Sequence, residues 1–216
     1  MTSRPPAPPL PKPQHPALAA KALAEAAYAA AHAWAQPLEP DSHNRAISQL
    51  YSTLRDLGIA ARGLASYQTA DAAPDPASRD FPRHLTASSR WLFSAYESLD
   101  GVLAAEGISS PPDPDEPGAA LCRAASNAIV AWRQSSGTSA DRDTTVRRFI
   151  TATGFLSSAT LGLAAYAPRR RSIDLQVAGA SLAEVIAYLT AAIQASAGNG
   201  APGDAGGPAG YQGGAE

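Results

Sequence analysis

The spacing of apolar residues is the feature that most constrains the fold of this chain. Apolar side chains recur every three or four positions along most of the sequence, which places them on one face of a helix. The most regular run covers about residues 42–69 and consists of Ile47, Leu50, Leu54, Leu57, Ala61, Leu64 and Gln68. Almost no strand-like alternation is present. The sequence therefore predicts an all-α protein.

Six segments carry this helical pattern, over about residues 17–36, 42–69, 82–107, 115–136, 140–167 and 173–196. The connections between them are short, and short connections favour antiparallel helices that are neighbours in sequence and in space. We therefore expect an up-and-down antiparallel bundle of five to six helices, with one domain over 17–196 that is large enough to bury a core.

The two ends of the chain differ in composition from this domain. Residues 1–16 are rich in proline, and residues 197–216 are rich in glycine, proline and alanine. Such segments have little apolar surface to bury. We expect a disordered arm at the N-terminus and a disordered tail at the C-terminus.

Charge and cysteine content narrow the choice of partner and compartment. The formal net charge is −2, which gives no general reason for binding nucleic acid or an anionic membrane. The single cysteine, Cys122, excludes an internal disulfide and a Cys-based zinc site and fits a reducing compartment. Residues 1–16 contain proline where a signal peptide would be apolar. These features predict a cytoplasmic protein.

An uncharged stretch from Phe149 to Pro168 lies between two groups of arginines, within RRFITATGFLSSATLGLAAYAPRRR (147–171). Its length of about 30 Å as a helix would cross a bilayer. However, serines and threonines dilute its apolar content, and the helix that follows carries Glu184 near its middle. We therefore interpret it as a buried bundle helix and not as a membrane span.

The flanking arginines are the candidate contact residues for an anion or a nucleic acid: Arg147, Arg148, Arg169, Arg170 and Arg171. As one helix separates the two groups, they would lie about 30 Å apart, and Arg133 and Arg142 could add charge near the first group. The competing interpretation is that the arginines are solvated helix ends. In that case Arg169–Arg171 would stabilise the C-terminal end of the preceding helix through its dipole.

No motif predicts catalysis, a metal or a cofactor. GNGAPG (198–203) lacks the preceding strand that a dinucleotide site needs, and PDPDEPG (112–118) lacks the later glutamate of a calcium loop. Glu39, Asp41 and His43 could together hold a metal, but Asp41 or Ser42 as a helix N-cap is a simpler explanation. YESLD (96–100) resembles the YxxxD export signal of type VII secretion substrates, although the loop from Thr69 to Asp80 lacks their WxG turn.

The amino-acid composition of the chain is also similar to that of a group of known proteins. Arginine far outnumbers lysine, and the stretches LAAKALAEAAYAAAHAW and HNRAISQLYSTLRDLGIAARGLASYQ are Ala-rich and helical in pattern. They resemble uncharacterised small all-α proteins of Streptomyces-type actinobacteria and their mobile elements. This resemblance implies a helical bundle and no known activity.

Together these features predict a non-enzymatic bundle that binds another macromolecule, most simply a protein or a second copy of itself. The regular apolar seams of segments 42–69 and 82–107 are the expected interface of a homo-oligomer. Three alternatives remain open: a DNA-associated accessory factor that uses the arginines, a bundle that binds a small hydrophobic ligand, and an exported helical protein.

Overall fold

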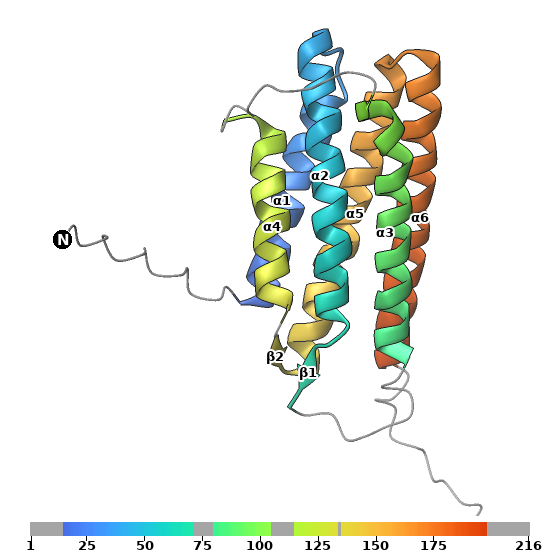
Figure 1. The fold of residues 1–216 in the computed structure, drawn as a ribbon. Coiled ribbons are helices and arrows are strands. Elements are labelled where there is room, and N and C mark those ends of the chain that lie inside the picture. Colours follow the sequence, from blue (N-terminus) through green and yellow to red (C-terminus); the bar gives the residue numbers. More distant parts are fainter. Residues whose placement is uncertain (1–14, 71–79, 105–114, 134, 198–216) are drawn as a thin grey trace, which may run out of the picture.

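The computed structural model describes residues 15–70, 80–104, 115–133 and 135–197 and contains six long helices. The predicted all-α bundle is confirmed, with the larger of the two expected helix counts. Most of the predicted arm and tail, and the motif GNGAPG, lie outside the described residues. The helices are α1 (Pro16–Trp34), α2 (Pro40–Leu64), α3 (Asp80–Ala104), α4 (Pro117–Trp132), α5 (Ser139–Tyr166) and α6 (Arg169–Ala197) (Figure 1).

Local sequence explains where the helices begin. Proline is the first residue of α1, α2 and α4, a position where its missing N–H costs nothing. The chain before α5 forms a capping box, in which Thr138 and Asp141 bond each other's backbone N–H groups. Residue Glu39 precedes α2 without a side-chain cap bond, so the expected cap by Asp41 or Ser42 is wrong. Pro16, which was assigned to the arm, is buried as the first residue of α1.

The six helices form a closed ring around one core. Going round the ring, the order is α1, α5, α6, α3, α2 and α4, and each helix packs chiefly on the two beside it. The core is made of leucine, alanine and a few aromatic side chains from all six helices. The apolar seam of α2 faces this core, with Ile47, Leu50, Leu54 and Leu57 at most 1% exposed.

Successive helices alternate in direction, as the up-and-down prediction requires (Figure 1). Sequence neighbours are not always neighbours in space, however, because α1 packs chiefly on α5 and α4 instead of α2. As a result two of the packed pairs are parallel. The start of α1 bonds Arg148 of α5 and its end approaches Gly162, while α2 and α4 run side by side from Gln49 and Gly118 onwards.

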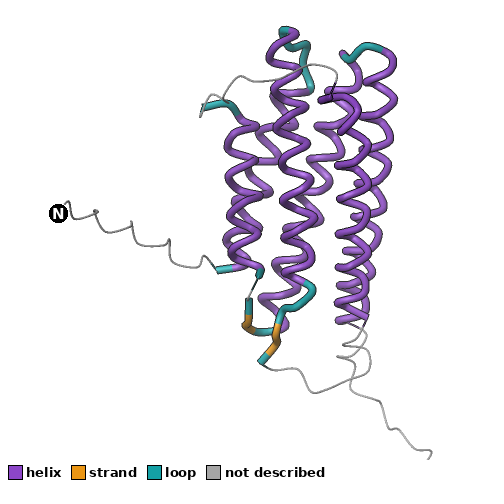
Figure 2. The backbone as a smooth tube through the Cα atoms, viewed as in Figure 1, coloured by secondary structure: helices purple, strands orange, loops and turns teal. Residues whose placement is uncertain are grey.

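A small pair of parallel strands joins the ends of two of these helices. Strand β1 (Gln68–Thr69) follows α2 and strand β2 (Ser136–Gly137) follows α4, with Gln68 opposite Ser136 (Figure 2). Because α2 and α4 are parallel, the chain leaves both in the same direction and can pair in parallel. The sequence pattern had extended the second helix through Gln68, so this ending was predicted wrongly.

Two glycines inside α5 provide a matched test of this packing. A Cβ at Gly162 would lie 2.7 Å from the backbone oxygen of Trp34, whereas a Cβ at Gly154 would meet no atom within 4 Å. We expect Gly162→Ala to lower the free energy of unfolding by about 1–3 kcal/mol, since helix backbones must move apart. Gly154→Ala should raise it by about 0.5–1 kcal/mol through helix propensity.

Urea unfolding followed by circular dichroism measures both changes. Equal effects of the two substitutions would contradict the close parallel approach of α1 and α5.

Candidate functional site

Two of the five candidate arginines act within the fold. Arg148 is half-buried, and its Nη1 donates to the backbone oxygen of Ala17 at 2.6 Å. Arg171 is also half-buried, and its Nη1 donates to Oδ1 of Asn44 at 3.0 Å. These bonds tie α5 to α1 and α6 to α2. Both side chains therefore have a structural explanation.

The other three candidates, Arg147, Arg169 and Arg170, are exposed. Arg169 and Arg170 begin α6, so the expectation that they finish the preceding helix is wrong. Cations in a first helical turn face the positive end of the dipole and cost about 0.3–1 kcal/mol each. This placement opposes local helix stability and needs another explanation.

Of the two possible contributors near Arg147, Arg133 is exposed, whereas Arg142 is engaged inside the bundle. Arg142 is largely buried, with its guanidinium 4.4 Å from the centre of the Phe81 ring. It also bonds Asp143 at 3.2 Å and Ser196 at 2.9 Å. Its charge is thus engaged within the bundle, and the two arginine groups remain separate at opposite ends of α5.

Several large apolar side chains are exposed on the outward side of α5 and α6. They are Leu161, Ile173 and Val177, each about half exposed, with Tyr166 at the end of α5. Between the arginines the residues at the surface are mostly small. Ala180, Ala183 and Ala187 are exposed, and Gly154 is half-buried. We call this surface, from Arg147 to Tyr166 on α5 and from Arg169 to Gln194 on α6, the α5–α6 face.

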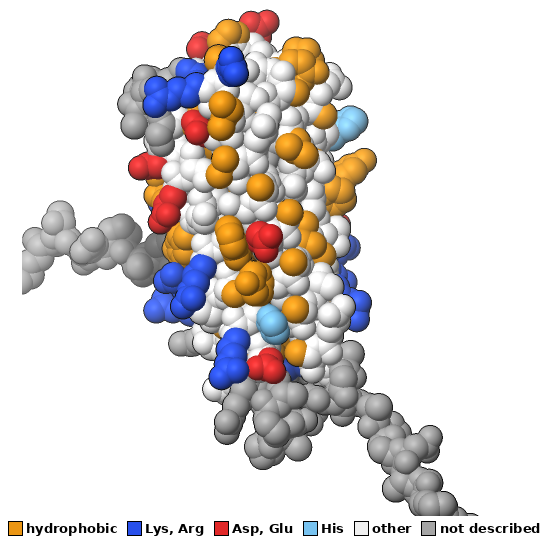
Figure 3. All heavy atoms as spheres, turned by 90° about the vertical axis from the view of Figure 1, so that its right-hand side faces the viewer, with side chains coloured by type: hydrophobic (Ala, Val, Ile, Leu, Met, Phe, Trp, Pro, Cys, Tyr) orange, Lys and Arg blue, Asp and Glu red, His pale blue; other side chains and the backbone are white. Residues whose placement is uncertain are grey.

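Two open hollows lie along this face, one near each end. The first has a volume of about 520 Å³ and the second about 740 Å³. Arg147, Ile150, Thr190, Ile193 and Gln194 line the first, and Leu161, Ala164, Ala165, Ala167, Arg169, Ser172, Ile173 and Gln176 line the second. On the side of the molecule where α3 and α6 face the viewer, hydrophobic side chains are scattered over the surface, with an acidic side chain among them near the middle (Figure 3).

Both helices are long and apolar enough to cross a membrane by length and composition alone. In the bundle, only 44% of the apolar window of each helix is buried. The sequence pattern indicated the apolar character of these segments but assigned all of it to the core. It missed the α5–α6 face because periodicity does not show whether a second apolar face is covered.

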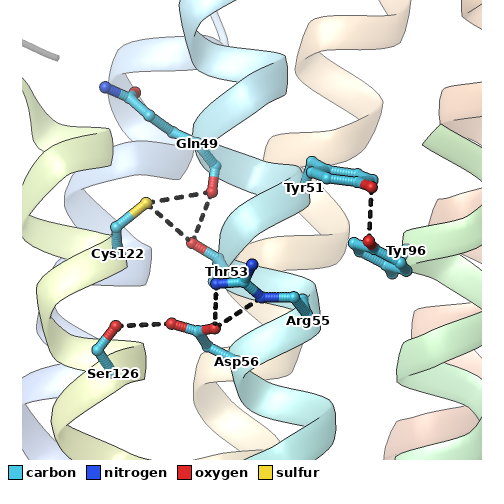
Figure 4. A network of polar contacts seen from close by, with 8 residues as sticks. All are labelled: Gln49, Tyr51, Thr53, Arg55, Asp56, Tyr96, Cys122 and Ser126. Carbon is cyan, nitrogen blue, oxygen red and sulfur yellow. Dashed lines mark hydrogen bonds and ion pairs between the residues drawn. The ribbon is translucent and has the colours of Figure 1, made fainter. Parts of the chain in front are cut away.

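A buried polar network connects the parallel helices α2 and α4 (Figure 4). Asp56, 7% exposed, accepts a 2.6 Å hydrogen bond from Ser126 and two bonds from Arg55. Thr53 and Cys122 both donate to the backbone oxygen of Gln49, at 2.8 and 3.3 Å. The carboxylate and the thiol have partners within the fold, so the network holds helices together without leaving a reactive group free.

Cys122 fits this structural role. Burial raises the pKa of its thiol, and the nearby carboxylate of Asp56 acts in the same direction, against the hydrogen bond from Thr53. A raised pKa means less thiolate at neutral pH, and the thiolate is the nucleophilic form. The half-buried Cys122 is therefore a poor nucleophile in the folded protein.

Both ends of the YESLD motif contact Tyr51 of α2. The hydroxyl of Tyr51 lies 2.6 Å from that of Tyr96 and 3.0 Å from Oδ1 of Asp100. Burial and these hydrogen bonds raise the pKa of Tyr51. The motif residues thus have a packing role between α2 and α3.

Among the described residues, no group of three His, Cys, Asp or Glu side chains could hold a metal. His43, one of three residues considered as metal ligands, is buried and hydrogen-bonds the backbone oxygen of Leu163 at 3.0 Å. Comparison with known proteins adds no further assignment: no family model, curated protein or solved structure matches this chain.

Arg147 and Arg148 are adjacent on α5, one exposed and one half-buried. Replacing each in turn tests which of them stabilises the fold. We expect Arg148→Ala to lower the free energy of unfolding by about 1–2 kcal/mol, because it removes a charged hydrogen bond and leaves the Ala17 carbonyl with one partner fewer. Arg147→Ala should change it by less than about 0.5 kcal/mol. Urea unfolding of both variants decides the matter, and similar losses would contradict the assignment.

The raised pKa of Cys122 gives a second prediction. At pH 8 the folded protein should react with iodoacetamide more slowly than the same protein in urea, since burial hinders access and keeps the thiol protonated. Mass spectrometry over time measures the rate. A folded protein that reacts faster than the unfolded chain would show an activated thiol instead.

Proposed function

We propose that this protein is a non-catalytic helical bundle that binds a partner protein through the α5–α6 face. One observation carries the proposal: α5 and α6 each contain an apolar window long enough to cross a membrane, and only 44% of each window is buried in the bundle. Contiguous exposed apolar surface commonly marks an interaction site.

A membrane is the first competing partner for an apolar face. Insertion of α5 would remove Phe149, Leu156 and Leu163, all fully buried, from the core they share with α1. Alanine, glycine, serine and threonine, which make up much of the face, contribute little to transfer into lipid. Glu184 of α6 would also enter the bilayer at a cost of about 2.5–3.5 kcal/mol.

Self-association through the seams of α2 and α3 is no longer a good model for a homo-oligomer. The apolar side chains of those seams form part of the core, where Leu50, Leu54, Leu85 and Leu92 are fully buried. A homo-oligomer would therefore also have to use the α5–α6 face.

Nucleic acid is supported less well than protein. The exposed candidates, Arg147 at one end and Arg169 and Arg170 at the other, are separated by about 30 Å of largely uncharged surface. A phosphate backbone is bound by cations spread along its path. The apolar middle of the face suits a protein instead.

The proposal is tested by cross-linking capture in the cells that make the protein. Leu161→Asp and Ile173→Asp should each abolish capture of the main partner, because they place a charge in an apolar contact. The matched control is Val130→Asp, since Val130 is 61% exposed on α4, away from the face. All three variants should keep wild-type thermal stability.

Three outcomes would contradict the proposal. Capture that survives both face variants would place the interface elsewhere. Capture that is lost after nuclease treatment would indicate nucleic acid. Recovery of the protein only with membranes, lost when Leu161 is changed, would indicate lipid.

A further inference from the structure

Charge is distributed unevenly along the α5–α6 face. Arg147 lies at one end, and Arg169 and Arg170 lie at the other, about 30 Å away along α5. After Asp143, α5 contains no acidic residue, and α6 contains two acids, the exposed Glu184 and the half-buried Asp174. The face therefore offers positive charge at both ends and almost none between them.

The two hollows of this face also place positive charge beside apolar surface. Each combines apolar side chains with one arginine: Ile150 and Ile193 with Arg147, and Leu161 and Ile173 with Arg169. A ligand that fills both hollows needs apolar groups over their floors and acidic groups near the arginines.

The middle of the face permits a close approach. A Cβ at Gly154 would meet no atom within 4 Å, and the exposed residues of α6 opposite it are small alanines. Small side chains let two helix axes come closer than the usual 8–10 Å. A helix is thus the element that best fits a straight seam between α5 and α6.

A second copy of this chain has the wrong charges for that position. If two copies paired antiparallel over the full face, Arg147 of each would meet the Arg169 and Arg170 end of the other. If they paired parallel, each arginine group would meet itself. Like charges would oppose each other in both arrangements, and such contacts disfavour a partner.

We infer that the α5–α6 face binds one amphipathic helix of about 20 residues from a partner protein, with acidic side chains in both of its terminal turns. This inference rests on the proposed function and names the kind of partner. The apolar side of the helix lies along the seam of α5 and α6, and its terminal acids pair with Arg147 and with Arg169 or Arg170. This is recognition of a helix in a groove.

The test is a selection of displayed peptides on the intact protein. The library consists of 24-residue peptides in which apolar residues recur every three or four positions and all other positions are random. Peptides selected on the wild-type protein should be enriched in Asp and Glu in both terminal turns. Selection on Arg147→Gln should lose this enrichment in one terminal turn of the peptide. Selection on the double variant Arg169→Gln with Arg170→Gln should lose it in the other terminal turn. The control Arg90→Gln, at an exposed arginine of α3, should change nothing.

The affinity of one selected peptide is then measured by fluorescence anisotropy on the same variants. Loss of Arg147 should weaken binding about two- to five-fold, as expected for a solvent-exposed ion pair. Leu161→Asp should weaken it more than about ten-fold, whereas Val130→Asp should have no effect.

The outcomes separate this inference from the proposed function. Selected peptides that lack terminal acids but depend on Leu161 would overturn the acidic helix and leave the face as the binding site. Peptides that bind Leu161→Asp as tightly as the wild-type protein would contradict both. Failure to select any peptide would overturn the inference alone, because cross-linking capture tests the face independently.

Discussion

The ring of helices closes through Trp132, the last residue of α4. Its side chain is fully buried, its Nε1 donates to the backbone oxygen of Pro16 at 3.1 Å, and its ring packs on Phe149 at 5.0 Å. A buried indole needs a partner for its N–H, and here that partner is the first residue of α1. One side chain therefore holds α4, α1 and α5 together, although 116 residues separate the two partners of the hydrogen bond. This contact joins the first helix of the chain to α4 and α5, which are its two neighbours in the ring.

The sequence predicted the helices and their directions, but not their neighbours in the ring. Short links reverse the chain, so each helix runs opposite to the one before it, and helices two or four apart in sequence run in the same direction. Whether two helices joined by a short link also pack on each other depends on how well their apolar faces complement each other in shape. The seam of α1 fits α5, where Gly162 leaves room for the backbone of Trp34. A parallel contact follows directly, and so does the one between α2 and α4.

The candidate arginines could be found from the sequence, but their roles could not. Arg148 and Arg171 bond groups that lie 131 and 127 residues away, and no local pattern predicts such partners. The sequence predicts a helix that starts at residue 173, because the three arginines before it show no apolar periodicity. The helix in fact starts directly after Pro168, whose backbone oxygen accepts from the N–H of Ser172 at 2.9 Å. This shift moves Arg169 and Arg170 from a favourable helix end to an unfavourable one.

In the complex proposed above, the small residues of the α5–α6 face would let one surface serve both the free and the bound protein. Exposed alanine and glycine present little apolar area to water, so the open face costs less than a face of leucines would. The larger anchors, Leu161, Ile173 and Val177, project from the end that carries Arg169, whereas at the Arg147 end Ile150 and Ile193 are half-buried or buried. In the proposed complex the bound helix would meet recessed apolar side chains at the Arg147 end and projecting ones at the Arg169 end. This asymmetry gives the helix a preferred direction, which two similar clusters of charge could not specify alone.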